Sequence, residues 1–274
     1  MLWNCVGMFI LTQFFLNNES MEKQFYVISY AGLKVYYTLR YPDAAVFFGW
    51  HIKPYSRVEG SILIDDVISL SESLRRKREG IFYPGTKDAF KEYRILVEPT
   101  GKLLSLNRRF IMHAVAFIWK ERAWLFTAPS GTGKTTQYLN WKNTWPEEVE
   151  ILCGDMPVLE WKENEQIWVH PSPWNGSEQF GKKNHKAAPL GGIVYLAQGV
   201  EDRICKADFH RLAKPLWHKM IGQADTEEQI CARAAFLDHM CRKYPVWMLV
   251  NRGDVCSAVL TRAEFETCFQ EERS

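Results

Sequence analysis

A short stretch rich in glycine, serine and threonine carries the strongest chemical signal in this sequence of 274 residues. It reads Ala128-Pro-Ser-Gly-Thr-Gly-Lys-Thr-Thr136, follows the apolar run 123–127 and precedes the helix-like segment 137–141. Strand, glycine-rich loop, lysine, hydroxyl and helix in this order are typical of a loop whose backbone N–H groups bind phosphate. The positive end of the helix dipole favours the same anion. The predicted phosphate-binding residues are Ser130, Gly131, Thr132, Gly133, Lys134, Thr135 and Thr136.

The first position of this stretch departs from the usual pattern G-x-x-x-x-G-K-[ST], because Ala128 stands where the first glycine is expected. Alanine is the smallest replacement, but it does not adopt a positive φ cheaply. Within the pattern, Lys134 would reach the outer phosphates of a nucleotide such as ATP, and Thr135 would offer its hydroxyl to Mg²⁺. The alternative is a glycine-rich turn that is merely structural.

Two further side chains could complete a phosphoryl-transfer site, which needs a carboxylate near the metal and a group that orients the incoming hydroxyl. Asp155 follows the apolar run 149–153, so we expect it at the carboxyl end of a strand, where α/β sheets place ligand-binding groups. His113 precedes the apolar run 114–119 and is the candidate for the hydroxyl. The alternatives are a loop aspartate or helix cap at 155 and a packed histidine at 113.

Composition limits the class of protein. The chain is 47% hydrophobic and 24% charged, as is usual for globular domains, and its net charge of +2 argues against a nucleic-acid binder. Its seven cysteines form no C-x-x-C pattern, which favours reduced thiols and gives no zinc-ligand spacing. The apolar segment 1–20 lacks a cationic start and is short for a membrane span. We therefore expect a cytoplasmic protein without stable membrane insertion.

The periodicity of the remaining chain predicts a small β-rich module over 21–106 and a larger α/β domain over 107–274. Strands are expected at 25–30, 33–38 (a hairpin), 44–50, 61–64, 93–98, 113–119, 123–127, 149–153, 158–161, 166–170, 193–196 and 246–250. Helices are expected at 108–112, after the glycine-rich loop, from the capping box Thr226-x-x-Gln229 to Tyr244, and from a second capping box at Thr261.

A long segment without periodicity, 171–189, is the natural place for an acceptor to bind. Its small residues, its indole and its ammonium groups could line a peptide-sized groove and neutralise the transferred phosphoryl group. The candidates on this acceptor side are Ser172, Trp174, Lys182, Lys183 and Lys186. The alternative is a solvated basic loop with Trp174 in the core.

The histidine fifteen residues before Ala128, the glycine-rich loop and the strand that ends at Asp155 together resemble a known family. They are similar to the catalytic core of bacterial HPr kinase/phosphorylase, in the structural group of phosphoenolpyruvate carboxykinase, over about residues 107–260. Segments near 189–196 and 245–259 also resemble short relatives found with peptide-maturation genes, including kinases of lasso-peptide precursors. The resemblance implies a P-loop kinase core with a mixed sheet.

The resemblance also implies roles for individual residues. His113 and an aspartate would serve the transferred proton, while Thr135 and an aspartate would hold Mg²⁺. The family commonly has an Asp-Asp pair where this chain has Gly154-Asp155, and Asp155 aligns with the metal ligand. His113 would then remove the proton alone, or Asp155 would do both jobs, or the enzyme would be slow. The C-terminal signature that recognises HPr has no match, so HPr is not the expected substrate.

We therefore predict an ATP-dependent kinase that phosphorylates a serine or threonine hydroxyl of a peptide or small protein, such as a ribosomally made precursor. One alternative is a catalytically weak nucleotide-binding regulatory module. Another is a carboxykinase-like enzyme acting on a small oxo-acid, which would need a second metal site and several substrate arginines. No nucleic-acid partner is expected, and assembly into a homo-oligomer is left open.

Overall fold

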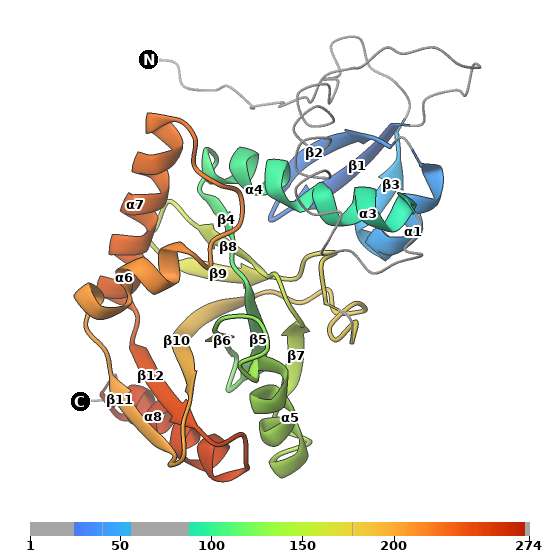
Figure 1. The fold of residues 1–274 in the computed structure, drawn as a ribbon. Helices are drawn as coiled ribbons and strands as arrows, with labels where there is room; N and C mark the ends of the chain where they lie inside the picture. Colours follow the sequence, from blue (N-terminus) through green and yellow to red (C-terminus); the bar gives the residue numbers. More distant parts are fainter. Residues whose placement is uncertain (1–24, 40, 56–87, 177, 272–274) are drawn as a thin grey trace. The chain divides into compact units, whose positions relative to one another are not determined.

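The chain forms two compact units, which span Met1–Leu103 and Leu104–Ser274 (Figure 1). The computed structural model describes residues 25–39, 41–55, 88–176 and 178–271. Each unit has a β-sheet of its own. The segment 1–20 and the strand predicted at 61–64 lie outside the described residues.

The first unit contains a three-stranded antiparallel sheet in the order β2-β1-β3. Ala31 and Gly32 join β1 to β2 with φ angles of 47° and 81°. A two-residue turn with positive φ at both positions has a twist that matches the twist of the two strands it joins. The predicted hairpin is confirmed. The strands are β1 (Phe25–Tyr30), β2 (Leu33–Thr38) and β3 (Ile52–Pro54).

Short helices make up the rest of the described first unit, so the strands predicted at 44–50 and 93–98 are wrong. Phe47 packs on Phe90 with ring centroids 5.1 Å apart, and Phe48 packs on Tyr93 at 5.0 Å. Phe90 and Tyr93 are three residues apart and so lie on the same face of a helix. The aromatic rings of this unit therefore pack helices together, although aromatic residues are also common in strands. The helices are η1 (Pro42–Ala44), α1 (Ala45–Phe48), η2 (Gly49–His51), α3 (Asp88–Ile95) and α4 (Val97–Ser105).

The second unit is built on a nine-stranded mixed sheet, as the α/β prediction requires. Its path runs β4-β8-β9-β10-β6-β5-β7, with β12 also paired to β10 and β11 paired to β12. β10 is parallel to β6 and β12 but antiparallel to β9. The strands are β4 (Arg109–Ile111), β5 (Ala114–Trp119), β6 (Arg122–Thr127), β7 (Glu150–Cys153), β8 (Val158–Trp161), β9 (Ile167–His170), β10 (Ala188–Gln198), β11 (Arg203–Lys206) and β12 (Val246–Asn251).

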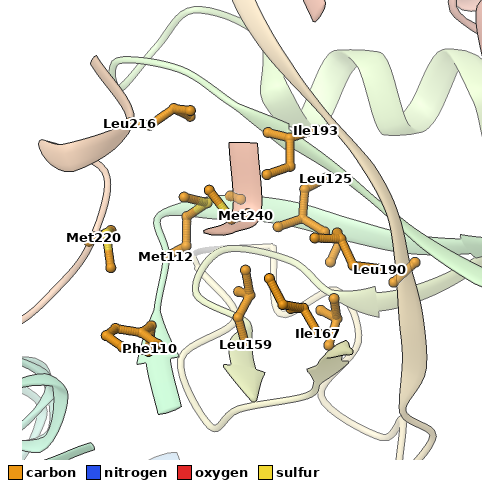
Figure 2. Packing of buried hydrophobic residues seen from close by; sticks show 14 of the residues in the cluster. Phe110, Met112, Leu125, Leu159, Ile167, Leu190, Ile193, Leu216, Met220 and Met240 are labelled. Carbon is orange, nitrogen blue, oxygen red and sulfur yellow. The ribbon is translucent and has the colours of Figure 1, made fainter. Parts of the chain in front are cut away.

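Helices cover both faces of this sheet because its central strands are apolar on both sides. Leu125 and Ile193 face a core shared with α6 (Phe209–Trp217) and α7 (Glu227–Lys243), part of which Figure 2 shows. Phe126 and Val194, their neighbours in sequence, face a second core with α5 (Lys134–Thr144) and α8 (Cys256–Glu271). The sheet therefore separates the helix after the glycine-rich loop from the helices α6 and α7.

Two predictions about the second unit need correction. The helix predicted at 108–112 is wrong: strand β4 (Arg109–Ile111) lies there, because Phe110 stacks on Phe236 of α7 at 3.9 Å and the strand pairs with β8. Helix α8 begins at Cys256, five residues before the capping box expected at Thr261, whose side chain is buried. Helix α6 and strand β11 were not anticipated, whereas the capping box at Thr226 is present.

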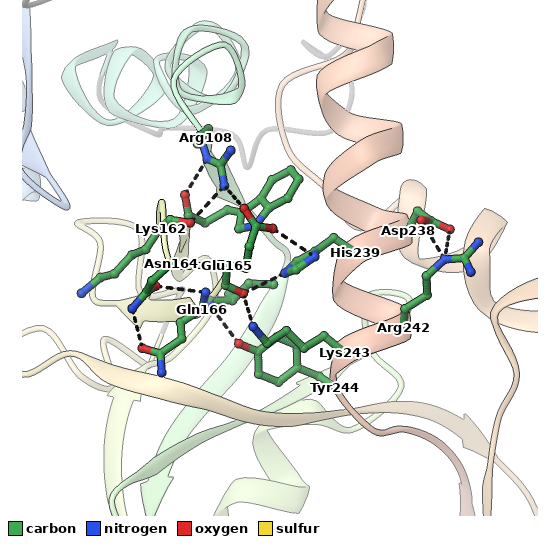
Figure 3. A network of polar contacts seen from close by, with 12 residues as sticks. Arg108, Lys162, Asn164, Glu165, Gln166, Asp238, His239, Arg242, Lys243 and Tyr244 are labelled. Carbon is green, nitrogen blue, oxygen red and sulfur yellow. Dashed lines mark hydrogen bonds and ion pairs between the residues drawn. The ribbon is translucent and has the colours of Figure 1, made fainter.

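A polar network fixes the tip of the β8–β9 hairpin to the end of α7 (Figure 3). The Glu165 carboxylate forms an ion pair with Arg108 at 3.2 Å. The backbone carbonyl of Glu165 lies 2.9 Å from the His239 ring and accepts a hydrogen bond from Lys243 at 2.6 Å. The Tyr244 hydroxyl accepts a hydrogen bond from the backbone N–H of Ile167 at 2.7 Å. These contacts are structural, since they join two elements of the fold.

Candidate functional site

The strand polarities bring the predicted catalytic residues to one edge of the large sheet. β5 is antiparallel to both β6 and β7, so β6 and β7 end where β5 begins. The glycine-rich loop leaves this edge after Thr127, whose hydroxyl donates to the carbonyl of His113 at 2.9 Å. Asp155 lies just past the end of β7, and its carbonyl accepts the N–H of Ala114 at 2.8 Å.

The loop between β6 and α5 has the backbone that anion binding requires. Gly131 and Gly133 have φ angles of 77° and 108°, whereas Ala128 is buried and does not have a positive φ. The position where glycine is missing therefore needs no left-handed conformation, and alanine fits there without strain.

Helix α5 begins without a cap, which leaves its first amides open to an anion. Gly133 occupies the N-cap position and provides no side-chain hydrogen bond. Within the described chain, the N–H groups of Lys134, Thr135 and Thr136 have no acceptor. A side chain usually satisfies one of these donors, so three donors without an acceptor in the described chain favour a phosphate or another anion at this end.

Lys134 is the first residue of α5 and only 8% exposed. Burial lowers the pKa of its ammonium group, nearby Asp155 opposes this effect, and nearby Lys219 adds to it. The Lys134 ammonium has no hydrogen bond or ion pair among the described residues. A buried cation without a partner is unfavourable until an anion binds beside it, so this side chain marks the centre of the site.

His113 and Asp155 lie next to each other at the same edge. The distance from His113 Nε2 to Asp155 Oδ1 is 3.1 Å, and both side chains remain partly exposed. An imidazole beside a carboxylate is an arrangement that can accept a proton from a hydroxyl group. The pair is therefore the candidate acid–base group for a hydroxyl that approaches from solvent.

Lys219 is a site residue that the sequence reasoning missed. It lies between α6 and α7, its backbone carbonyl accepts the N–H of His113 at 2.7 Å, and the next residue, Met220, bridges to Met112. Burial lowers the pKa of Lys219, and among the described residues its ammonium has no partner. No local sequence motif predicts that Lys219 belongs to the site. It lies there because residues 219 and 220 pair with the chain just before β5, which is distant in sequence.

The predicted metal ligands can be judged by their chemistry. Thr135 is in the first turn of α5 and offers a hydroxyl, and Asp155 offers a carboxylate, which are the oxygen ligands that Mg²⁺ prefers. Among the described residues, the single group of three potential metal ligands is Asp202, Asp254 and Cys256. Arg252 bridges its two carboxylates, so that group serves the fold.

The predicted acceptor residues do not act together. Ser172 and Trp174 have no exposed surface. The Ser172 hydroxyl donates to the carbonyl of Met156 at 2.6 Å, and Met156 N–H donates to the carbonyl of Trp174 at 3.1 Å. They support the turn that carries Asp155 and cannot line a groove, so we assign them to structure.

The three lysines predicted on the acceptor side follow in the same loop. Lys183 is exposed, Lys182 is half-buried, and Lys186 pairs with Glu150 at 2.5 Å. Glu150 is opposite Ile118, at the end of the β5–β7 pair remote from His113, about 15 Å away at ~3.3 Å per residue. Lys186 is therefore outside the reaction centre.

Gly154 is a glycine because the chain passes close to it. A Cβ at this position would lie 2.7 Å from the carbonyl oxygen of Phe180 and 2.8 Å from that of Asn175. The Gly154 N–H also donates to the side chain of Asn175 at 3.1 Å. The backbone of Asn175 and Phe180 thus occupies the space that the first carboxylate of an Asp-Asp pair would need.

Restoring that carboxylate is expected to damage the protein. The variant Gly154→Asp should lower stability by about 1–3 kcal/mol, because the nearest atoms are backbone and cannot move away cheaply. Gly154→Ala, which adds the same Cβ without charge, should show most of this loss in thermal unfolding. A faster phosphoryl transfer by Gly154→Asp at unchanged melting temperature would contradict this account.

Comparisons with known proteins give little beyond this geometry. No protein-family model matches the sequence, and no curated protein does either. One solved structure that resembles this chain is the Hpr(Ser) kinase/phosphatase from Coxiella burnetii, at 11% sequence identity and a TM-score of 0.33. The match covers 60% of this chain and 95% of that one. The likeness is weak, so the arguments below rest on the site itself.

Among the described residues, no helix combines the length and the apolar character that crossing a membrane requires.

Proposed function

We propose that this protein is an ATP-dependent phosphotransferase that acts on a serine or threonine hydroxyl of a peptide or small protein. The observation that carries the proposal concerns one edge of the sheet. There the uncapped start of α5, with the buried Lys134 that has no hydrogen bond or ion pair among the described residues, meets the His113–Asp155 pair. The first feature suits the phosphates of the donor. The second suits the hydroxyl of the acceptor.

The phosphates of ATP would accept hydrogen bonds from the amides of the loop 130–136, and the Lys134 ammonium would neutralise their outer charge. Lys219 supplies a second ammonium from the His113 side, where the transferred group must pass. Thr135 and Asp155 are the residues that would hold Mg²⁺. When bound, the metal would neutralise charge on the phosphate oxygens.

In the reaction, the acceptor oxygen forms a bond to the γ-phosphorus while the bond from this phosphorus to the β–γ bridging oxygen breaks. ADP carries away the bridging oxygen, and the proton of the acceptor hydroxyl passes to the His113–Asp155 pair. The carboxylate 3.1 Å from His113 Nε2 stabilises the charge that the imidazole gains. This removes the need for a second carboxylate at position 154.

The chain around Gly154 favours one competing function. Since Asn175 and Phe180 fill the place of a second carboxylate, a nucleotide-binding module with little or no turnover has the same support from the loop and Lys134. The two functions differ in one observable, because only the phosphotransferase converts bound ATP to ADP when an acceptor is added.

The test uses the full chain with ATP, Mg²⁺ and a panel of serine- and threonine-containing peptides, including any short peptide encoded beside its gene. We expect ATP to bind in calorimetry, and ADP to form together with a peptide that has gained one phosphoryl group by mass spectrometry. Binding without turnover on every acceptor would support the regulatory module. Absence of ATP binding would overturn both functions.

A further inference from the structure

Three buried polar side chains meet behind the first turn of α5. Gln137, Asn251 and Ser257 are 0%, 3% and 0% exposed. Gln137 Nε2 donates to Asn251 Oδ1 at 3.1 Å and to Ser257 Oγ at 2.7 Å. We refer to these residues as the Gln137 triad. Buried polar groups are unfavourable unless they are hydrogen-bonded, so three of them at one point require an explanation.

The hydrogen bonds of the triad make both partners acceptors for the Gln137 amide nitrogen. Asn251 Nδ2 donates to the carbonyl of Ala197 on β10 at 3.0 Å, which turns Asn251 Oδ1 towards Gln137. Ser257 Oγ lies 2.6 Å from the carbonyl of Asp254 and 3.1 Å from Gln137 Oε1, and with its single proton on either of these acceptors it still accepts from Gln137 Nε2. Both partners thus present acceptors to Gln137, and an amide N–H₂ group satisfies both at once.

The triad is directly connected to the phosphate-binding loop. Gln137 follows Lys134 by three residues, and its backbone N–H donates to the carbonyl of Gly133 at 2.9 Å. Asn251 is the last residue of β12, and Ser257 is in the first turn of α8. The start of α5 is therefore attached, through directional bonds, to a strand end and to a second helix.

We propose that Gln137, Asn251 and Ser257 are positioning residues, which fix the first turn of α5 and so hold the loop amides and Lys134 in the geometry that phosphates require. The inference rests on the proposed function, because it assumes that this loop binds ATP. Apolar packing tolerates small sliding and rotation, whereas three hydrogen bonds with defined directions do not. The triad therefore supplies the orientation at the point where the chemistry demands it.

The same two helices offer a matched control. Trp141 Nε1 donates to Thr261 Oγ1 at 2.9 Å, one helical turn further along α5, and both residues are fully buried. This bond also joins α5 to α8, but it is remote from the loop. A residue that only stabilises the contact between the helices should behave like Thr261, and a positioning residue should not.

The experiment compares Gln137→Met with Thr261→Val in the full chain. Each variant removes one buried hydrogen-bonding group while nearly keeping its volume, so both should melt at a lower temperature. ATP affinity by calorimetry and kcat/KM for transfer should fall by about 10²-fold in Gln137→Met and stay unchanged in Thr261→Val. Gln137→Glu should be no better than Gln137→Met, because a carboxylate would face Asn251 Oδ1 and Ser257 Oγ.

Two further arms make the outcome decisive. Ser257→Ala removes one acceptor of the triad, and it replaces Gln137→Met in the same measurements if Gln137→Met does not fold. In Lys134→Met, adding Gln137→Met should weaken ATP binding by a smaller factor than it does in the wild-type protein, since only the loop amides are then left to be positioned. Failure of the wild-type protein to bind ATP would remove the proposed function and this inference together. Wild-type ATP affinity and turnover in folded Gln137→Met, with loss in Lys134→Met, would overturn this inference alone.

Discussion

Replacing Lys134 by methionine is expected to abolish phosphoryl transfer and to weaken ATP binding by at least a hundredfold. The ammonium group is buried and has no hydrogen bond or ion pair among the described residues, so its attraction to a bound phosphate would be little screened by water. Removing one group that stabilises the charge of the transition state in a preorganised site costs about 10²–10³-fold in kcat. Loss of ground-state binding adds to this effect.

The measurement is calorimetric titration with ATP, followed by transfer assays at saturating acceptor. Lys183→Met is the control, because it removes the same charge from an exposed position outside the loop. It should bind ATP as the wild-type protein does. Normal turnover by Lys134→Met would sink the proposed function, since no other lysine in the described chain is in the first turn of α5.

The same substitution should stabilise the protein without nucleotide, and the gain should depend on pH. Burial holds the pKa of Lys134 in the folded state below its ordinary value of about 10.4. At pH values between the pKa of Lys134 in the folded state and its higher pKa in the unfolded state, the unfolded chain binds more protons than the folded chain. The wild-type protein therefore gains stability as the pH rises through this interval. Lys134→Met has no such group. Its advantage in chemical unfolding should therefore be largest below the interval and shrink as the pH rises through it.

Replacing Asp155 by asparagine is the second substitution with a large expected effect. Asparagine keeps the volume and leaves the backbone bond from Ala114 N–H to the carbonyl of residue 155 intact, but it removes the negative charge next to His113. We expect kcat to fall by about 10²–10⁴-fold, the range for loss of a positioned acid–base group. A Mg²⁺ titration separates the two roles of Asp155. Loss of a metal ligand raises the Mg²⁺ requirement, and loss of the base lowers kcat at saturating Mg²⁺.

The chain provides a matched control for this variant. His170 Nε2 and Glu160 Oε2 form a pair at 2.9 Å on β8 and β9, with side-chain exposures of 20% and 15%, against 22% and 16% for His113 and Asp155. Glu160 also forms an ion pair with Arg109 at 3.2 Å. Glu160→Gln therefore removes the carboxylate of a histidine pair of similar burial, together with that ion pair, away from the loop. It should retain full transfer activity. Equal losses in both variants would show that Asp155 acts through stability alone.

Local sequence signals were sufficient for much of the larger unit. The apolar runs that became β5, β6, β7 and β12, the β8–β9 hairpin and the helix that starts at the Thr226 capping box could all be predicted. Each of these signals depends on residues near in sequence, through strand patterning, turn chemistry or a cap. Asp155 at the end of a strand was predictable for the same reason.

The errors fall where distant residues decide the local conformation. Phe110 lies in a strand because it packs on Phe236, more than a hundred residues away, and the aromatic run 44–50 is helical because Phe47 and Phe48 meet the rings of α3. The acceptor assignment of Ser172 and Trp174 also failed, since sequence alone cannot tell that both side chains are buried beneath Asp155. Burial is a property of the assembled fold.

By itself, the sequence determined which groups are on offer: a glycine-rich loop with Lys134, a carboxylate at Asp155 and an imidazole at His113. Only the tertiary structure decided that His113 and Asp155 lie 3.1 Å apart, that Lys219 joins them, and that Gly154 has no room for a second carboxylate. The physical reason is that side-chain types and caps are encoded locally. Distances between groups on different strands depend instead on sheet order and register, which the whole chain sets by packing.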